Sequence, residues 1–289
     1  MSSPTFDLQS HSTHSDGELA PERVVTEAAT AGVELLALTD HDSVDGVPAA
    51  LQAAQRLGIK LIPATEISIV DESAPDLHLC GYGIDIENQQ LQEQLARSRS
   101  EREARIWRSA ERLQELGWEV DLGMLEDRAK AGRSVGRPHL AGAVVSCQAN
   151  RIRLAEEQIN GPSAFLAAYL IEGKPGFSER RGPSAAEAIK LIHDAGGMAV
   201  WAHPFWDFEA TAEVEATLAR FTGEGLDGVE AFYITHNRAQ SELLVAAASR
   251  HGLITTGSSD YHGPNHSRFN HFRAFQTFDL PVTLGPLAA

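Results

Sequence analysis

The chain is poor in cysteine and has no long apolar run. Among its 289 residues only Cys80 and Cys147 carry a thiol. We therefore expect neither a disulfide framework nor a zinc or iron–sulfur site built from cysteines. No stretch approaches the roughly 18 to 20 apolar residues that a membrane-spanning helix requires, and no basic segment precedes an apolar core near the first residue. We expect a soluble, cytoplasmic protein with no membrane partner.

Basic residues are also scarce. The chain has 24 Lys and Arg residues against 40 Asp and Glu residues, which gives a formal net charge of −16. Such an excess of negative charge repels the phosphate backbone of a long nucleic acid. The composition therefore argues against a protein that binds long nucleic acid, and nothing in the sequence indicates an obligate protein partner. The twelve histidines need a different explanation.

Short segments of apolar and β-branched residues alternate with helix-periodic segments, a pattern typical of βα units. The sequence predicts seven strands, at residues 5–8, 34–38, 59–64, 77–83, 198–202, 228–232 and 253–257, and offers an eighth at 274–278. A long charged helix begins near residue 88, and no strand is predicted between it and residue 197. An α/β barrel with an inserted helical subdomain and a loose tail at 280–289 is the simplest interpretation.

Nearly every predicted strand end carries a histidine or an acid. Along the chain these residues are His11, Asp16, Asp40, His41, Asp42, Glu66, His78, His203, Glu230, His236, Asp260 and His262. A β/α barrel brings the carboxyl ends of its strands to one rim, so these side chains are expected to lie close together. Imidazole and carboxylate ligands without cysteine suit zinc, manganese or iron. Two or three ions sharing a carboxylate commonly serve the hydrolysis of phosphate esters.

Four segments, at residues 7–17, 38–42, 202–204 and 257–262, resemble the motifs of the PHP (polymerase and histidinol phosphatase) family. Residues 136–139 and 173–176 are similar to one branch of it, which holds nucleotide bisphosphate phosphatases and 5′-to-3′ exoribonucleases. The resemblance implies a distorted seven-stranded β/α (TIM-like) barrel made by residues 1–90 and 182–289. It also implies that residues 91–181 form a helical insert over the active-site mouth.

The resemblance also implies a set of metal ligands. One ion would be held by His11, Glu66 and Asp260. Glu66 would bridge to a second ion, which His78 and His203 would also hold. A third ion would be held by Asp16, His41 and His262. The ions would be manganese, iron or zinc, with manganese favoured. A metal-bound hydroxide held by Glu66, His203 and Asp260 would attack the phosphorus. Substrate contacts are predicted for four residues of the branch, Arg137, His139, Lys174 and His236, although helix capping or packing is a rival role for the two histidines.

Gln9 departs from the family pattern. The first motif of the family is His-x-His, and Gln9 stands where its first histidine belongs. An amide oxygen is a poorer donor to a transition metal than an imidazole nitrogen. Three outcomes follow: a trinuclear site with Gln9 as a weak ligand, a working dinuclear site, or an inactive site. His14 is a candidate substitute ligand. We favour retained activity because every other ligand position is intact.

The predicted function is hydrolysis of a phosphomonoester on a nucleotide. The substrate would be a 3′,5′-bisphosphate or a 5′-phosphate nucleotide, with short oligoribonucleotides as further candidates. One alternative is a histidinol-phosphate-type phosphatase, which shares the metal site. The other is a non-catalytic nucleotide-binding module weakened at Gln9.

Overall fold

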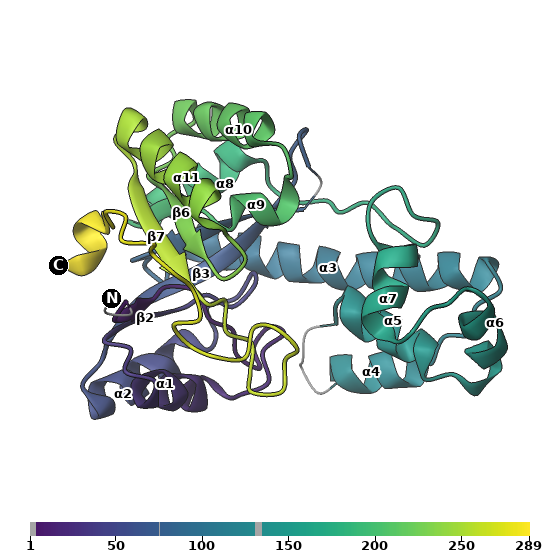
Figure 1. Ribbon diagram of the computed structural model, residues 1–289. Helices are drawn as coiled ribbons and strands as arrows, with labels where there is room; N and C mark the ends of the chain where they lie inside the picture. Colours follow the sequence, from purple (N-terminus) through teal and green to yellow (C-terminus); the bar gives the residue numbers. More distant parts are fainter. Residues whose placement is uncertain (1–3, 75, 131–134) are drawn as a thin grey trace. The chain divides into compact units, whose positions relative to one another are not determined.

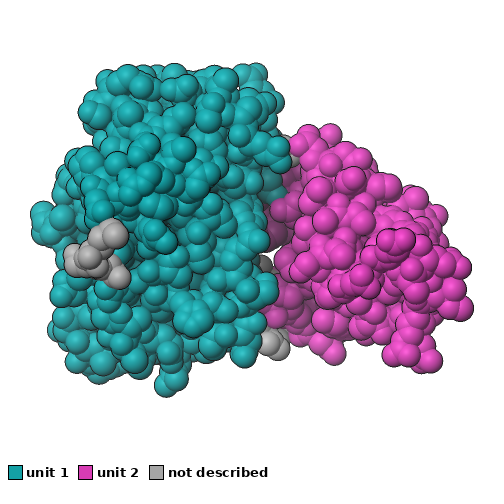
Figure 2. Space-filling model, viewed as in Figure 1, with its two compact units in different colours: residues 1–96, 182–289 teal, residues 97–181 magenta. Residues whose placement is uncertain are grey.

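The chain divides into two compact units. The computed structural model describes residues 4–74, 76–130 and 135–289. Unit 1 comprises Met1–Ala96 with Gly182–Ala289, and unit 2 comprises Arg97–Arg181 (Figures 1 and 2). Unit 1 holds the sheet, whereas the described part of unit 2 is helical.

Unit 1 is built around seven strands that follow one another in sheet order. The strands are β1 (Phe6–Asp7), β2 (Leu35–Leu38), β3 (Lys60–Ile69), β4 (Leu77–Tyr82), β5 (Met198–Trp201), β6 (Gly228–Tyr233) and β7 (Ile254–Ser258). The segments of the first and last strands meet. The N–H of Leu8 donates to the carbonyl of Gly257 at 3.1 Å, and the N–H of His11 donates to the carbonyl of Tyr261 at 2.8 Å. The sheet thus nearly closes into a barrel. The prediction of a seven-stranded β/α barrel is confirmed, and residues 274–278 form an irregular segment with one bend and the start of a turn rather than an eighth strand.

Strand β4 runs against the others. It pairs antiparallel with both β3 and β5, while all other neighbouring strands pair in parallel. The beginning of β4 therefore lies at the edge where β3 and β5 end, and the N–H of Ala202 donates to the carbonyl of His78 at 3.1 Å. This reversal explains why His78 stands near the start of its strand, whereas the other candidate ligands of the barrel stand near strand ends.

Strand β3 is longer than the predicted segment 59–64. It pairs with β2 only as far as Pro63, and its remaining residues up to Ile69 pair with β4, while Glu66 also forms an isolated parallel bridge with His41. Glu66 therefore lies within a strand, opposite Cys80, rather than in the loop after one. The ladder to β4 fixes its backbone from one side, and the bridge to His41 fixes it from the other.

Helices flank the barrel strands. Those of unit 1 are α1 (Pro21–Thr30), α2 (Val47–Leu57), α8 (Ala185–Asp194), α9 (Pro204–Asp207), α10 (Thr211–Gly223) and α11 (Arg238–His251). In Figure 1, α1 and α2 lie on one side of the strands and α8, α10 and α11 on the other. Helix α10 is missing from the predicted elements, although Val214, Leu218 and Phe221 are spaced for one helical face and are buried.

The C-terminal segment packs onto the barrel, so the prediction of a loose tail is wrong. The N–H of Thr255 donates to the carbonyl of Thr283 at 2.8 Å, next to β7. A short 3-10 helix, η3 (Gly285–Ala288), then buries Leu287 in the main core. Proline limits the backbone hydrogen bonds of this segment but does not prevent such packing.

Unit 2 has a core of its own. Its helices are the C-terminal part of α3 (Gln89–Glu115), then α4 (Leu122–Lys130), α5 (Arg137–Val145), η1 (Gln148–Asn150), α6 (Arg151–Glu156), α7 (Pro162–Phe165) and η2 (Leu166–Leu170). Trp118 is buried at its centre, with the ring centroid of Phe165 at 5.1 Å. Within the described parts of both units, no helix combines the length and apolar character needed to span a bilayer.

Candidate metal centre

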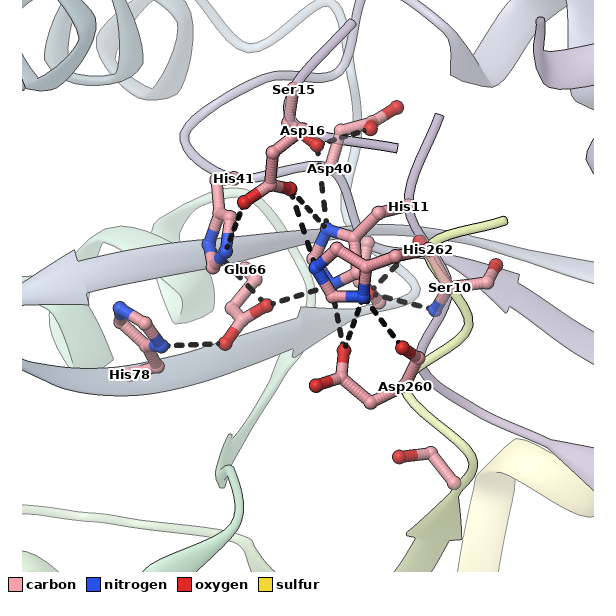
Figure 3. Close-up of polar contacts among 12 residues, drawn as sticks. Ser10, His11, Ser15, Asp16, Asp40, His41, Glu66, His78, Asp260 and His262 are labelled. Atoms are coloured by element: carbon pink, nitrogen blue, oxygen red, sulfur yellow. Dashed lines mark hydrogen bonds and ion pairs between the residues drawn. The ribbon is translucent and has the colours of Figure 1, made fainter. Parts of the chain in front are cut away.

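Three groups of histidines and acids converge at one edge of the barrel. The groups are His11, Asp16, His41 and His262; His41, Glu66 and His78; and His11, Glu66 and Asp260. Within each group the candidate ligand atoms all lie within 4.8 Å of one another. The side chains come from segments far apart in the sequence and point toward one another (Figure 3). His11 and His41 each belong to two groups, so the three groups form one continuous cluster.

Glu66 occupies the centre of the cluster. Its Oε1 lies 2.8 Å from Nδ1 of His78 and 3.0 Å from Nε2 of His203, which joins His203 to the cluster. Its Oε2 lies 3.2 Å from Nε2 of His11 and 3.4 Å from Nδ1 of His41. The two carboxylate oxygens thus face different sets of imidazoles, which is the geometry of a bridging ligand.

Two aspartates complete the cluster at its other side. Oδ1 of Asp16 lies 3.7 Å from Nδ1 of His11 and 3.4 Å from Nε2 of His262. Its Oδ2 lies 3.7 Å from Nε2 of His41. Asp260 approaches His11 Nε2 at 3.0 Å. The structure therefore brings together the eight residues for which the sequence predicts a metal-ligand role, Gln9 apart. His41 stands between Asp16 and Glu66 rather than beside Asp16 alone.

The buried charges of the cluster hold one another ionised. Burial alone would lower the pKa of His11, but the carboxylates of Asp260 and Glu66 raise that pKa well above its usual value. Burial alone would raise the pKa of Glu66, but His41 and His78 lower it well below its usual range. The carboxylates are thus charged at neutral pH, as metal coordination requires.

The donor set fits divalent metal ions. It combines imidazole nitrogens with carboxylate oxygens, and the described cysteines lie outside all three groups. Glu66 Oε2, Asp260 Oδ1 and His11 Nε2 are buried without a hydrogen bond, although a buried polar atom normally has one. A divalent cation would satisfy all three atoms. Nitrogen and oxygen donors of this kind suit zinc, manganese and iron alike.

A second set of carboxylates holds the backbone that carries the candidate ligands. Asp40 accepts hydrogen bonds from the N–H and hydroxyl of Ser12, at 2.7 and 2.6 Å, and from the hydroxyl of Ser15 at 2.6 Å. Asp7 accepts from the N–H and hydroxyl of Ser259, at 2.9 and 2.6 Å. Ser12 follows His11, Ser15 precedes Asp16 and Ser259 precedes Asp260, so these bonds position the backbone beside three candidate ligands.

Glu230 holds His203 in the same way. Its carboxylate accepts from the N–H of His203 at 2.9 Å and from the hydroxyl of Ser258 at 2.6 Å. Burial raises the pKa of Glu230 to about 8. Asp40 and Glu230 stand at predicted strand ends, but the sequence predicts no role for them. The serines beside the metal-ligand motifs are the available signal for such a role.

Two candidate ligands lie in turns with unusual backbone geometry. His203 has φ of 32° and Asp260 has φ of 53°, both in the left-handed region that side chains disfavour. The bonds of Glu230 to His203 and of Asp7 to Ser259 help to hold these turns. Strain of this kind persists where the surrounding structure fixes it and is common at functional sites.

Gln9 lies two residues before His11 and is fully buried. Side chains of alternate residues in an extended segment share a face, which places Gln9 on the face of His11. Neither amide atom of Gln9 forms a hydrogen bond with the described residues. His14 is exposed and lies outside the three groups, so the geometry does not support it as a substitute ligand.

The predicted substrate-binding residues lie in different parts of the chain. Arg137 and His139 are in the first turn of α5, where Nδ1 of His139 accepts from the N–H of Gly136 at 3.0 Å and so caps the helix. Lys174 is exposed in a turn of unit 2. His236 belongs to unit 1 and is buried beside β6, where burial lowers its pKa to about 4. The roles of these residues in substrate binding stay predictions.

The fold and the cluster define a hydrolase of the metal-dependent class built on a β/α barrel. A PHP domain model matches residues 7–149. A 3′,5′-nucleoside bisphosphate phosphatase of Chromobacterium violaceum is 32% identical over 295 residues, covering 98% of this chain and 94% of that protein. A 5′-3′ exoribonuclease of Salmonella typhimurium is 33% identical over 270 residues, covering 90% of this chain and 85% of that protein.

A solved structure agrees with these relatives. An amidohydrolase of Chromobacterium violaceum, solved with bound sulfate and no metal, superposes with a TM-score of 0.79 at 30% identity over 98% of this chain and 93% of that one. The chain belongs to the PHP family. The prediction of a metal-dependent phosphoric ester hydrolase of this family is thereby confirmed.

Proposed function

We propose that this protein removes a phosphate group from a nucleotide, with a 3′,5′-bisphosphate or a 5′-phosphate nucleotide as substrate and short oligoribonucleotides as further substrates. The observation that carries the proposal is the convergence of the three groups around Glu66, with candidate ligand atoms within 4.8 Å of one another in each group. The similarity to a nucleoside bisphosphate phosphatase and an exoribonuclease over most of the chain supports a nucleotide rather than histidinol phosphate.

We further propose that the predicted ligands hold two or three divalent ions, with manganese favoured. Glu66 would be shared between ions, because its two oxygens face different histidines. When bound, such ions neutralise phosphate oxygens and lower the pKa of a coordinated water. Gln9 would be the weakest donor of the set, since an amide oxygen carries no charge.

The chain's own residues would orient these groups. Tyr233 donates its hydroxyl proton to Oδ2 of Asp260 at 2.7 Å, which leaves Oδ1 directed at His11. Glu230 fixes the backbone of His203, and Asp40 fixes the loop that carries Asp16. Ligands held in this manner need little reorganisation when phosphate binds. Arg137 and Lys174 are proposed to contact phosphate oxygens through their positive charges.

Phosphate release with added manganese tests the proposal. The substrates are a 3′,5′-bisphosphate nucleotide, a 5′-mononucleotide, a short oligoribonucleotide and histidinol phosphate. We expect release from the nucleotides. Replacement of His203 or Asp260 by alanine should lower kcat/KM at least about 100-fold, since metal ions contribute several kcal/mol to such reactions. His271→Ala is the matched control, because His271 is an exposed histidine outside the three groups.

Three results would contradict parts of this proposal. Release from histidinol phosphate alone would move the enzyme to another substrate class. Retention of full activity by metal-loaded His203→Ala would remove that residue from the centre. Metal content near zero after incubation with manganese would favour a binding module instead.

A further inference from the structure

Trp206 is an exposed aromatic side chain close to the metal centre. It lies in α9, three residues after His203, and 48% of its surface is exposed. Among the described residues it is the single aromatic member of the exposed large hydrophobic side chains. Exposing an indole forgoes a large hydrophobic gain, and Trp is enriched where proteins bind partners or ligands.

Buried rings hold Trp206 in place. The ring centroid of Phe269 lies 5.7 Å from that of Trp206, and the centroid of Tyr233 lies 6.3 Å away at a steep interplanar angle. The guanidinium of Arg268 lies 5.5 Å from the indole centroid. Phe269 and Tyr233 are themselves buried, so these two rings form a fixed aromatic wall against which the indole packs.

This wall is connected to the metal centre. The hydroxyl of Tyr233 donates to Asp260 at 2.7 Å, and the ring of Phe269 lies 5.4 Å from that of His262. One side chain thus separates Trp206 from the candidate ligand Asp260. All of these residues belong to unit 1.

An unused hydrogen-bond acceptor lies beside the wall. His236 packs its ring against Tyr233 and Phe205, with centroids 5.5 and 5.6 Å apart. Its Nδ1 faces the carbonyl of Ala231 at 3.3 Å, which assigns the proton to Nδ1. Its Nε2 is then an acceptor, and this atom is buried with no hydrogen bond among the described residues.

We propose that the exposed indole of Trp206, held in place by Tyr233 and Phe269, is the stacking surface for the base of the nucleotide, and that His236 Nε2 accepts a hydrogen bond from a hydroxyl or amino group of the same ligand. This inference rests on the proposed function and adds the part of the substrate that the metal centre does not bind. Stacking on an aromatic side chain tolerates every base because each base has a flat π-face. The surface therefore selects nucleotides over other phosphate esters but discriminates weakly among bases.

Kinetics on two substrates separate base binding from phosphate binding. The manganese-loaded enzyme is assayed on adenosine 5′-monophosphate and on ribose 5-phosphate, which lacks the base. Trp206→Ala should raise KM for the nucleotide roughly 10-fold and leave KM for ribose 5-phosphate unchanged. Trp206→Phe should recover most of the loss, because a phenyl ring also stacks. Leu57→Ala, which alters an exposed apolar residue at the end of α2, is the matched control.

A binding measurement gives a readout that does not depend on catalysis. Adenosine, which has no phosphate, is titrated into the metal-free protein while tryptophan fluorescence is recorded. Quenching is expected in the wild type and in Trp107→Phe, and its loss is expected in Trp206→Phe.

The outcomes distinguish the two proposals. Equal KM changes for both substrates in Trp206→Ala would refute the stacking surface and leave the phosphatase function standing. If the wild type releases phosphate from none of the nucleotides named for the proposed function, that function fails, and the adenosine titration then tests the stacking surface by itself. Quenching that persists in Trp206→Phe would overturn the inference.

Discussion

Replacing Gly17 by alanine should remove one metal ion without unfolding the barrel. A Cβ atom at Gly17 would lie 2.3 Å from the carbonyl oxygen of His11, 2.5 Å from its carbonyl carbon and 2.7 Å from the nitrogen of Ser12. Carbon atoms in favourable contact are separated by about 3.5 to 4.0 Å, so the loop has to move by about 1 Å. The backbone of Ser12 cannot yield easily, because its N–H is bonded to Asp40 at 2.7 Å.

The displaced loop carries Asp16, the residue next to Gly17. Its carboxylate lies 3.4 Å from His262 and 3.7 Å from His11 and His41. Metal coordination tolerates errors of only about 0.2 Å in ligand distance, so a shift of about 1 Å should abolish binding at this group. Overpacking of this kind costs roughly 1–3 kcal/mol of stability, which leaves a typical domain folded.

The assay is metal content per chain by mass spectrometry after incubation with manganese and desalting, together with thermal unfolding. We expect Gly17→Ala to hold about one ion fewer than the wild type and to melt cooperatively. Gly223→Ala is the control, because a Cβ there meets no atom within 4 Å. Unchanged metal content in Gly17→Ala would refute both the steric argument and the role of Asp16.

Three further predictions concern affinity and stability. Gln9→His should raise metal content at limiting manganese, because an imidazole replaces a neutral amide oxygen; equal titration curves for both proteins would exclude Gln9 from the centre. Ser184→Ala should lower the free energy of unfolding by about 1 kcal/mol in denaturant titrations, because Ser184 caps α8. An unchanged free energy of unfolding would show that this cap does not stabilise the helix. The pKa of Asp71 is lowered: burial alone would raise it, but hydrogen bonds from Arg220 outweigh that effect. Asp71→Asn should therefore cost up to about 1 kcal/mol at pH 7. This difference should shrink as pH falls through the lowered pKa of Asp71, and a constant difference would contradict it.

The sequence predicted the order of strands and helices well, because that order depends on patterns among neighbouring residues. Alternating apolar segments and helix-periodic segments follow from the two backbone geometries, and β4 (Leu77–Tyr82) lies within one residue of the strand predicted at 77–83. The order of the strands along the sheet follows the order along the chain. The histidines and acids at strand ends could be named for the same reason, since a barrel gathers its strand ends at one rim, and the resemblance to the PHP family selected the candidate ligands among them.

Other features depend on contacts between distant residues. The direction of β4 is not written in the residues of β4; it follows from its pairing with β3 and β5, and it decides that His78 reaches the cluster. The bonds of Asp7 to Ser259 and of Glu230 to His203 join residues that the sequence separates widely. No local pattern predicts which carboxylate will meet which serine.

By itself, then, the sequence determined the βα alternation and the residue types at the candidate metal centre, because both are set by side-chain chemistry and short-range spacing, whereas the anomaly at Gln9 is visible only against the motif of the PHP family. Only the tertiary structure decided that Glu66 faces different histidines with its two oxygens and that Trp206 stands exposed beside Tyr233 and Phe269. The physical reason is that coordination, stacking and burial are properties of distances in space, and the folded sheet alone sets those distances.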